Sequence, residues 1–146
     1  MDSLPTRIAA KMKEVDVGCA DLQHLSLNPD GLRMIRTWEN DLCNLLASMA
    51  AEMQKSKRNE LYTYIARRTM QAEKFREARQ DDGMTQKDAE EVSRLLVGDK
   101  AKEEARAAAY MEALWTLRSA LIKKIEFVQN VANDIKHLDK ITLRAQ

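Results

Sequence analysis

The chain has 146 residues, a formal net charge of +1 and 32% charged residues, with only 4 Gly, 2 Pro and 5% aromatic residues. Glycine and proline are too scarce for an all-β, collagen-like or low-complexity chain, and the apolar runs are too short for a membrane-spanning helix. The strong helix formers Ala, Leu, Glu, Lys, Arg and Met dominate, which predicts an all-α fold. With two cysteines, Cys19 and Cys43, and no cationic, apolar leader at its start, we expect a cytoplasmic protein with reduced thiols.

The first thirty residues predict a short helical leader. A helix is expected to begin after Ser3, with Pro5 in its first turn, and to end near Glu14. Residues 15–18 interrupt the pattern, and residues 21–27 can hold one or two further turns. The Asn-Pro-Asp-Gly sequence at 28–31 is typical of a turn and predicts a break between helices. We therefore expect a leader over residues 1–30 and a main domain over residues 31–146.

A long helix is predicted from Leu32 to about Arg79, where no helix breaker occurs. Its first apolar positions are spaced 3 and 4, as in a heptad seam: Ile35, Trp38, Leu42, Leu45 and Met49. The seam is lost between Met53 and Leu61 and resumes in a shifted phase at Leu61, Tyr64 or Ile65, Arg68, Ala72 and Phe75. This shift predicts either a bend near residues 55–59 or an elongated hairpin that pairs with other copies, and we favour the hairpin.

Two more helices follow an Asp-Asp-Gly break at residues 81–83. Thr85 is expected to cap a short helix that stops at Gly98 and points Ala89, Val92, Leu95 and Leu96 inward. The last helix follows Asp99 and has no breaker before the C-terminus. Its inward residues are expected to be Ala108, Met111, Leu114, Leu121, Ile125, Val128, Ala132, Ile135 and Leu138.

These narrow apolar seams need partner helices. We therefore predict a long-helix antiparallel hairpin or bundle with coiled-coil-like seams that forms a homo-oligomer. The residues expected to hold the oligomer together lie on the last helix: Met111, Leu114, Leu121, Ile125, Val128 and Ile135.

Charge is unevenly distributed along the chain. Residues 55–79 hold eight Lys or Arg and three Asp or Glu, a net charge of +5. Residues 81–104 hold four Lys or Arg and eight Asp or Glu, a net charge of −4. Cations meet phosphates and rings stack on bases, which is typical of single-stranded nucleic acid binding. The candidate contact residues are Lys55, Lys57, Arg58, Tyr62, Arg67, Arg68 and Lys74. The alternative is that the charge blocks pair helix against helix, within the chain or between copies.

Enzyme motifs are missing from the sequence, which has no Gly-rich phosphate loop, no Gly-x-Ser-x-Gly and no Cys-x-x-Cys. Two carboxylate–imidazole pairs, Asp21/His24 and Asp134/His137, have the i, i+3 spacing that dimetal helix bundles use. Exposed polar pairs remain the simpler interpretation. We predict a non-enzymatic protein without cofactor or metal, and a metal-dependent enzyme is the weakest alternative.

Three segments of the chain are similar to phage proteins: Ala50-Ala51-Glu52 through Arg58, Glu60 and Tyr64; Leu96-Val97-Gly98-Asp99-Lys100; and the ladder Tyr110, Leu114, Leu121, Ile125 and Ile135. Over about residues 38–138 the chain resembles the recombination mediators of T-even-type phages and their marine relatives (UvsY-like). The resemblance implies a ring-forming bacteriophage protein in the host cytoplasm. Such a protein binds single-stranded DNA, displaces the single-strand binding protein and loads a RecA-like recombinase. It also implies DNA contacts at Lys55, Lys57, Arg58, Arg67 and Arg68. The alternative function is a structural or adaptor protein that acts only through protein–protein contacts.

Overall fold

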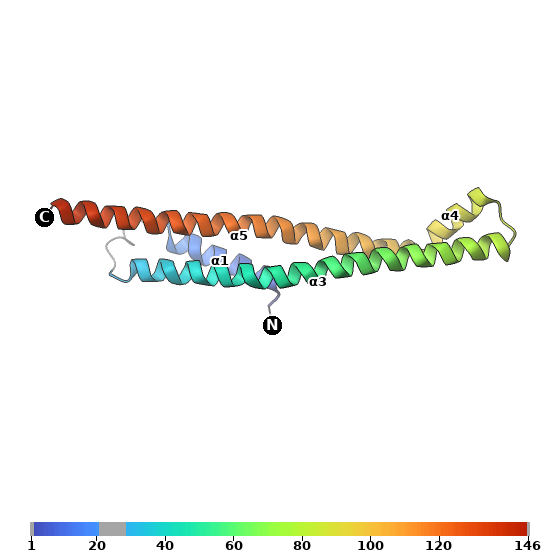
Figure 1. The fold of residues 1–146 in the computed structure, drawn as a ribbon, viewed down its shortest axis with the longest axis horizontal. Helices are drawn as coiled ribbons and strands as arrows, with labels where there is room; N and C mark the ends of the chain where they lie inside the picture. The colour runs from blue at the N-terminus through green and yellow to red at the C-terminus, as the bar shows by residue number, and fades with distance from the viewer. Residues whose placement is uncertain (1, 21–28, 146) are drawn as a thin grey trace. The chain divides into compact units, whose positions relative to one another are not determined.

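The computed structural model describes residues 2–20 and 29–145, in which every regular element is a helix (Figure 1). The helices of these residues are α1 (Leu4–Gly18), α3 (Gly31–Gln80), α4 (Gln86–Leu96) and α5 (Gly98–Ala145). The predicted all-α fold is confirmed. The turns expected at residues 21–27 lie outside the described residues. None of the described helices has an apolar stretch that could cross a membrane.

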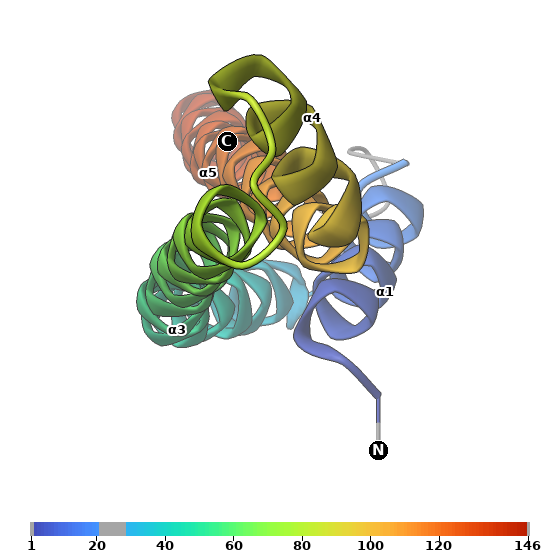
Figure 2. The ribbon, with the colours of Figure 1, turned by 90° about the vertical axis from the view of Figure 1, so that its right-hand side faces the viewer.

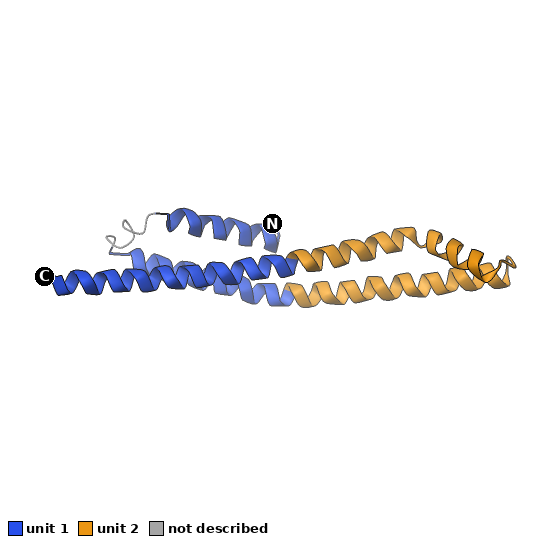
Figure 3. Ribbon diagram, turned by 90° about the horizontal axis from the view of Figure 1, so that it is seen from above, with its two compact units in different colours: residues 1–51, 114–146 blue, residues 52–113 orange. Residues whose placement is uncertain are grey.

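The chain divides into two compact units (Figure 3). Unit 1 comprises residues 1–51 and 114–146, and unit 2 comprises residues 52–113. Each of the long helices α3 and α5 contributes one part to each unit. This division differs from the predicted leader and main domain, because α1 belongs to the same unit as the start of α3 and the end of α5.

Helix α1 begins where the sequence predicts and ends four residues later. The side chain of Ser3 accepts a hydrogen bond from the backbone N–H of Thr6 at 3.4 Å, and Pro5 lies in the first turn. The predicted interruption at residues 15–18 is wrong, since the helix continues to Gly18. Burial explains the difference: Val15 is completely buried, and that gain outweighs the modest helix propensity of valine.

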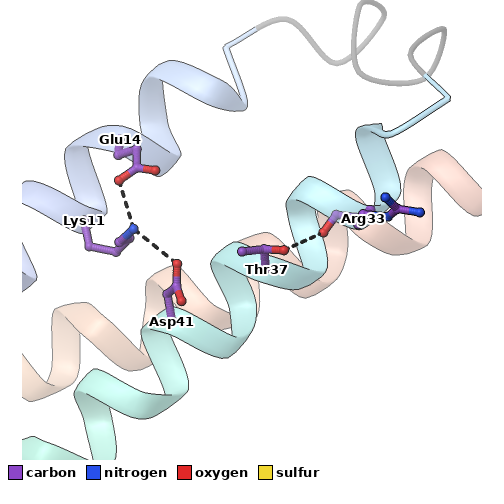
Figure 4. Close-up of polar contacts among 5 residues, drawn as sticks. All are labelled: Lys11, Glu14, Arg33, Thr37 and Asp41. Carbon is purple, nitrogen blue, oxygen red and sulfur yellow. Dashed lines mark hydrogen bonds and ion pairs between the residues drawn. The ribbon is translucent and has the colours of Figure 1, made fainter.

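Unit 1 places α1 beside α3, and two observations show how close the contact is. Lys11 pairs with Glu14 on its own helix at 2.9 Å and with Asp41 on α3 at 3.2 Å (Figure 4). The hydrogen bond to Glu14, reinforced by Asp41, raises the pKa of Lys11 against the opposing effect of burial. At the end of α1, a Cβ on Gly18 would lie 2.5 Å from ring carbon Cζ2 of Trp38. Only glycine therefore allows this approach.

The core of unit 1 is built from large apolar side chains, as predicted for the start of the long helix. Ile35, Trp38, Leu42, Leu45 and Met49 of α3 are all buried, together with Ile8 and Val15 of α1. Helix α5 contributes the third side of this core, and the amide of Gln129 donates to Glu39 on α3 at 2.8 Å.

The six residues predicted to hold an oligomer are buried inside the single chain. Their exposed fractions are at most 9%. The apolar seam therefore finds its partner helices within the chain, and in unit 1 the predicted N-terminal helix α1 joins α3 and α5 as a third helix, which the pattern did not reveal. An oligomer of this fold would need other contact residues than Met111, Leu114, Leu121, Ile125, Val128 and Ile135.

In unit 2 the end of α3 runs antiparallel to the start of α5. The Tyr110 hydroxyl donates to Glu52 at 3.0 Å, and Arg67 pairs with Glu104, so a later residue on α3 meets an earlier one on α5. Helix α4 lies between them in the chain (Figure 2). The turn before it needs Gly83, whose φ of +64° is unfavourable for other residues. Thr85 caps α4 as predicted, accepting from the N–H of Asp88 at 3.2 Å.

The interior of unit 2 contains many small and polar side chains among fewer large apolar ones. Ser56, Thr63 and Ser93 are buried there, alongside Met53, Ala78, Ala89, Val97, Ala107 and Met111. On α3 the buried positions continue the heptad spacing through Met53, Ser56 and Thr63, so the predicted phase shift of the seam does not occur. Helix α3 is also unbroken through residues 55–59, where a bend was the alternative.

Several apolar residues of unit 2 that the sequence predicts to be inside are outside. Leu61 and Ile65 on α3 are 58% and 52% exposed, and Leu95 and Leu96 on α4 are 70% and 56% exposed. These four large apolar residues therefore lie on the surface of the unit, while smaller residues occupy much of its interior.

Candidate nucleic-acid interface

The exposed side of α3 in unit 2 carries two rows of residues with helical spacing. Lys55, Arg58 and Tyr62 are three and four residues apart and share one row, which we call the cationic ridge. Lys57, Leu61, Tyr64 and Arg68 share the neighbouring row, which we call the groove row. All seven are exposed, and neither row contains a carboxylate.

A groove of about 640 Å³ runs between the groove row and the start of α5. Its α3 side includes Lys57, Arg58, Leu61 and Tyr64, and its α5 side includes Glu104 and Ala108. The lining is mainly apolar because Leu61, the ring of Tyr64 and Ala108 face it. Glu104 adds little free negative charge, since Arg67 pairs with it. Glu60 is a half-buried acid at the edge of the groove.

The structure leaves five of the seven predicted contact residues open to solvent. Lys55, Lys57, Arg58, Tyr62 and Arg68 are exposed, and none of their four cations forms an ion pair within residues 2–20 and 29–145. These cations are free to meet an anionic ligand, because no acid of the described chain neutralises them in the fold.

The two other predicted residues have partners inside the protein. Arg67 is about one-fifth exposed, pairs with Glu104 and donates to Gln71 at 3.0 Å. Lys74 pairs with Glu77 at 3.0 Å. Arg67 thus connects α3 to α5, so its first role is structural. The heptad spacing could have shown this, since Arg67 and Lys74 continue the series of buried Ser56, half-buried Glu60 and buried Thr63.

The two tyrosines of this surface differ in what their rings can do. The guanidinium groups of Arg67 and Arg68 lie 5.7 and 6.0 Å from the centre of the Tyr64 ring. These cation–π contacts hold the Tyr64 ring in place at the groove. Tyr62 is 72% exposed, so its ring offers a flat surface beside Lys55 and Arg58.

Tyr110 is the third tyrosine and belongs to the interface between α3 and α5. Burial, together with the hydrogen bond to Glu52, raises the pKa of its hydroxyl above the usual range. Tyr110 therefore stays protonated at neutral pH and keeps donating its hydrogen bond.

The candidate metal pairs do not assemble into a site in the described part of the chain. No group of three His, Cys, Asp or Glu side chains comes together there. Asp134 and His137 are exposed on α5, whereas Asp21 and His24 lie outside the described residues.

Comparison of the chain with known protein families, with curated proteins and with solved structures finds no match in any of the three. Any functional argument therefore depends on the residues and geometry of the chain itself.

Proposed function

We propose that the chain is a non-enzymatic protein that binds single-stranded DNA along the cationic ridge of α3. The observation that carries the proposal is the exposure of Lys55, Arg58 and Tyr62 in one row, where neither cation forms an ion pair with an acid of the described residues. Two cations followed by an open aromatic ring in the same row give the combination that single strands need: phosphates meet the charges, and a base stacks on the ring. Lys57 and Arg68 add positive potential from the groove row.

The resemblance to phage recombination mediators supports a more specific role. A protein of that kind acts in the host cytoplasm as a homo-oligomer, displaces the single-strand binding protein and helps a RecA-like recombinase onto DNA. Under this proposal the ridge holds the strand, and repeated ridges in an oligomer present it to the recombinase.

Fluorescence anisotropy with a labelled single strand of about thirty nucleotides tests the DNA-binding step. We expect wild-type affinity to fall steeply with salt. Since each phosphate contact to a single strand contributes about 0.7 to the slope of log K against log [salt], Lys55→Ala/Arg58→Ala should reduce that slope by about 1.4. Tyr62→Ala should weaken binding about tenfold and leave the slope unchanged, because a ring contributes stacking rather than charge.

The matched control is Lys87→Ala/Lys102→Ala, which removes two exposed lysines of the same unit that lie among acids. It should bind the strand nearly as the wild type does. Undetectable binding at low salt, or equal losses in the ridge variant and the control, would refute the proposal.

An adaptor that works through protein contacts is the second candidate. The exposure of Leu61 and Ile65 favours it, since single-stranded DNA gains little from aliphatic side chains. A stable complex with protein partners, together with no affinity for nucleic acid, would support the adaptor over the DNA-binding protein.

A further inference from the structure

The positive charge of α3 in unit 2 is concentrated in the first part of its basic segment. Residues 55–68 hold five Lys or Arg and one Glu, a net charge of +4. Residues 73–77 hold two Lys or Arg and two Glu, a net charge of zero, and the four residues 69–72 between these stretches are uncharged. The potential that attracts phosphates is therefore strong over the first stretch and weak beyond it.

Glu73 and Arg76 repeat the positions of Lys55 and Arg58 further along the same helix. Lys55 and Glu73 are 18 residues apart, as are Arg58 and Arg76, and 18 residues make five full turns of an α-helix. Glu73 therefore lies on the same side of α3 as Lys55, and Arg76 on the same side as Arg58. All four side chains are exposed. The ridge thus carries two bases where its repeat carries one acid and one base.

Arg76 is as open as the cations of the ridge but has acidic neighbours. It forms no ion pair within the described residues, and Glu73 and Glu77 lie three residues before it and directly after it. Glu77 is paired with Lys74 at 3.0 Å, whereas Glu73 has no such partner among those residues. Side chains three residues apart on a helix have Cβ atoms about 5–6 Å apart, so a phosphate at Arg76 also meets the Glu73 carboxylate.

We propose that Glu73 ends the DNA site of unit 2, so that one chain holds about six nucleotides and Arg76 takes no part. This inference rests on the proposed DNA binding and adds the length of strand that one chain recognises. Lys55 and Arg68 are 13 residues apart, which is about 20 Å along the helix at about 1.5 Å per residue. A strand stacked as in duplex DNA rises about 3.4 Å per nucleotide, so about six nucleotides cover this span and an extended strand needs fewer.

Fluorescence anisotropy of the full chain with labelled strands of six and nine nucleotides tests this length. For the wild type, the slope of log K against log [salt] should have the same size for both strands. We expect a slope between about 1.4 and about 2.8, because either the two ridge cations or all four exposed cations of residues 55–68 meet phosphates, at about 0.7 for each contact. Arg76→Ala should leave both slopes unchanged, although it removes an exposed cation from the same helix.

Glu73→Lys should lengthen the site, because it converts the repeat into a second pair of bases. The cations then extend from Lys55 to Arg76, about 32 Å or about nine stacked nucleotides. The slope for the nine-nucleotide strand should grow by about 1.4, while the slope for the six-nucleotide strand stays as in the wild type. Adding Arg76→Ala to this variant should remove about half of the gain. The matched control is Glu126→Lys, which makes the same charge change at an exposed position of α5 in unit 1 and should leave both slopes unchanged.

The results separate this inference from the proposed function. A wild type that binds no single strand of any length at low salt refutes both. A wild type that binds a long strand but not the six-nucleotide strand, or binds nine nucleotides with a steeper slope than six, overturns only the proposed length. A lower slope in Arg76→Ala, no gain in Glu73→Lys, or an equal gain in Glu126→Lys also overturns the role of Glu73 and leaves DNA binding in place.

Discussion

Ser56→Ala should make the protein more stable, although it removes a polar group from α3. Ser56 is 5% exposed, and its hydroxyl has no hydrogen-bond partner among the described residues. A buried hydroxyl without a partner costs about 1–3 kcal/mol, and alanine is about 0.5 kcal/mol better than serine within a helix. We therefore expect the free energy of unfolding to rise by about 2 kcal/mol.

Ser48→Ala on the same helix is the matched control. Ser48 is exposed, and its hydroxyl donates to the backbone carbonyl of Asn44 at 3.1 Å. Its replacement should change stability by about 0.5 kcal/mol or less, since no buried polar group is removed. The difference between the two variants therefore isolates the cost of burying the Ser56 hydroxyl.

Urea unfolding followed by circular dichroism measures both variants against the wild type. The midpoint for Ser56→Ala should rise while the slope of the transition stays constant. In thermal unfolding, a gain of about 2 kcal/mol should raise Tm by about 4–8 °C. A Ser56→Ala protein that is no more stable than Ser48→Ala would refute the reasoning, because the hydroxyl would then be satisfied in the native fold.

Three further changes test unit 1. Leu121→Ala should lower the free energy of unfolding by about 3 kcal/mol in the same assay, because it empties a fully buried site; a loss below about 1 kcal/mol would contradict the assigned core. Gly18→Ala should destabilise by about 1–2 kcal/mol through its clash with the ring of Trp38, and it should become neutral or stabilising when Trp38→Leu removes the ring. Burial, with some help from Asp16, raises the pKa of the Cys19 thiol, so a thiol reagent at pH 8 should label Cys43 quickly and Cys19 only on unfolding. The sign for stability follows from the raised pKa: the contribution of Cys19 is complete below the ordinary thiol pKa and is lost as pH rises through the raised value.

The sequence predicted the helices well because their ends are marked by local chemistry. Ser3 caps α1, Thr85 caps α4, and Gly83 provides the only backbone turn with positive φ among the described residues. The seam from Ile35 to Met49 was also correct, since large apolar residues at heptad spacing are buried whenever a partner helix is present.

Which side of each helix in unit 2 is buried could not be predicted from the spacing of apolar residues. Leu95 and Leu96 were expected inside, yet Ser93 is buried in their place. Hydrophobic periodicity identifies the apolar face of a helix, but it does not say whether that face meets its own chain or remains open. The smaller residues Ala89 and Ser93 allow close packing of α4, and this advantage is invisible in a pattern of large apolar residues.

The candidate site was predicted in part for a similar reason. The sequence identified a basic helix, but the role of each cation depends on whether it lies on the solvent side of α3 or on the side that packs against α5. Lys55 and Arg58 face solvent, whereas Arg67 lies where α5 brings Glu104 against it. That pairing joins residues 37 positions apart, so no local pattern could reveal it.

Photo-cross-linking of a single strand that carries 5-iodouracil tests the central claim most directly, because such a base reacts with an aromatic ring stacked against it. Mass spectrometry of the digested complex should place the cross-link on Tyr62, in the cationic ridge, and Tyr62→Leu should abolish it. A cross-link located instead on Trp115 or Phe127 of α5, with none on α3, would contradict the proposal that this ridge holds the DNA.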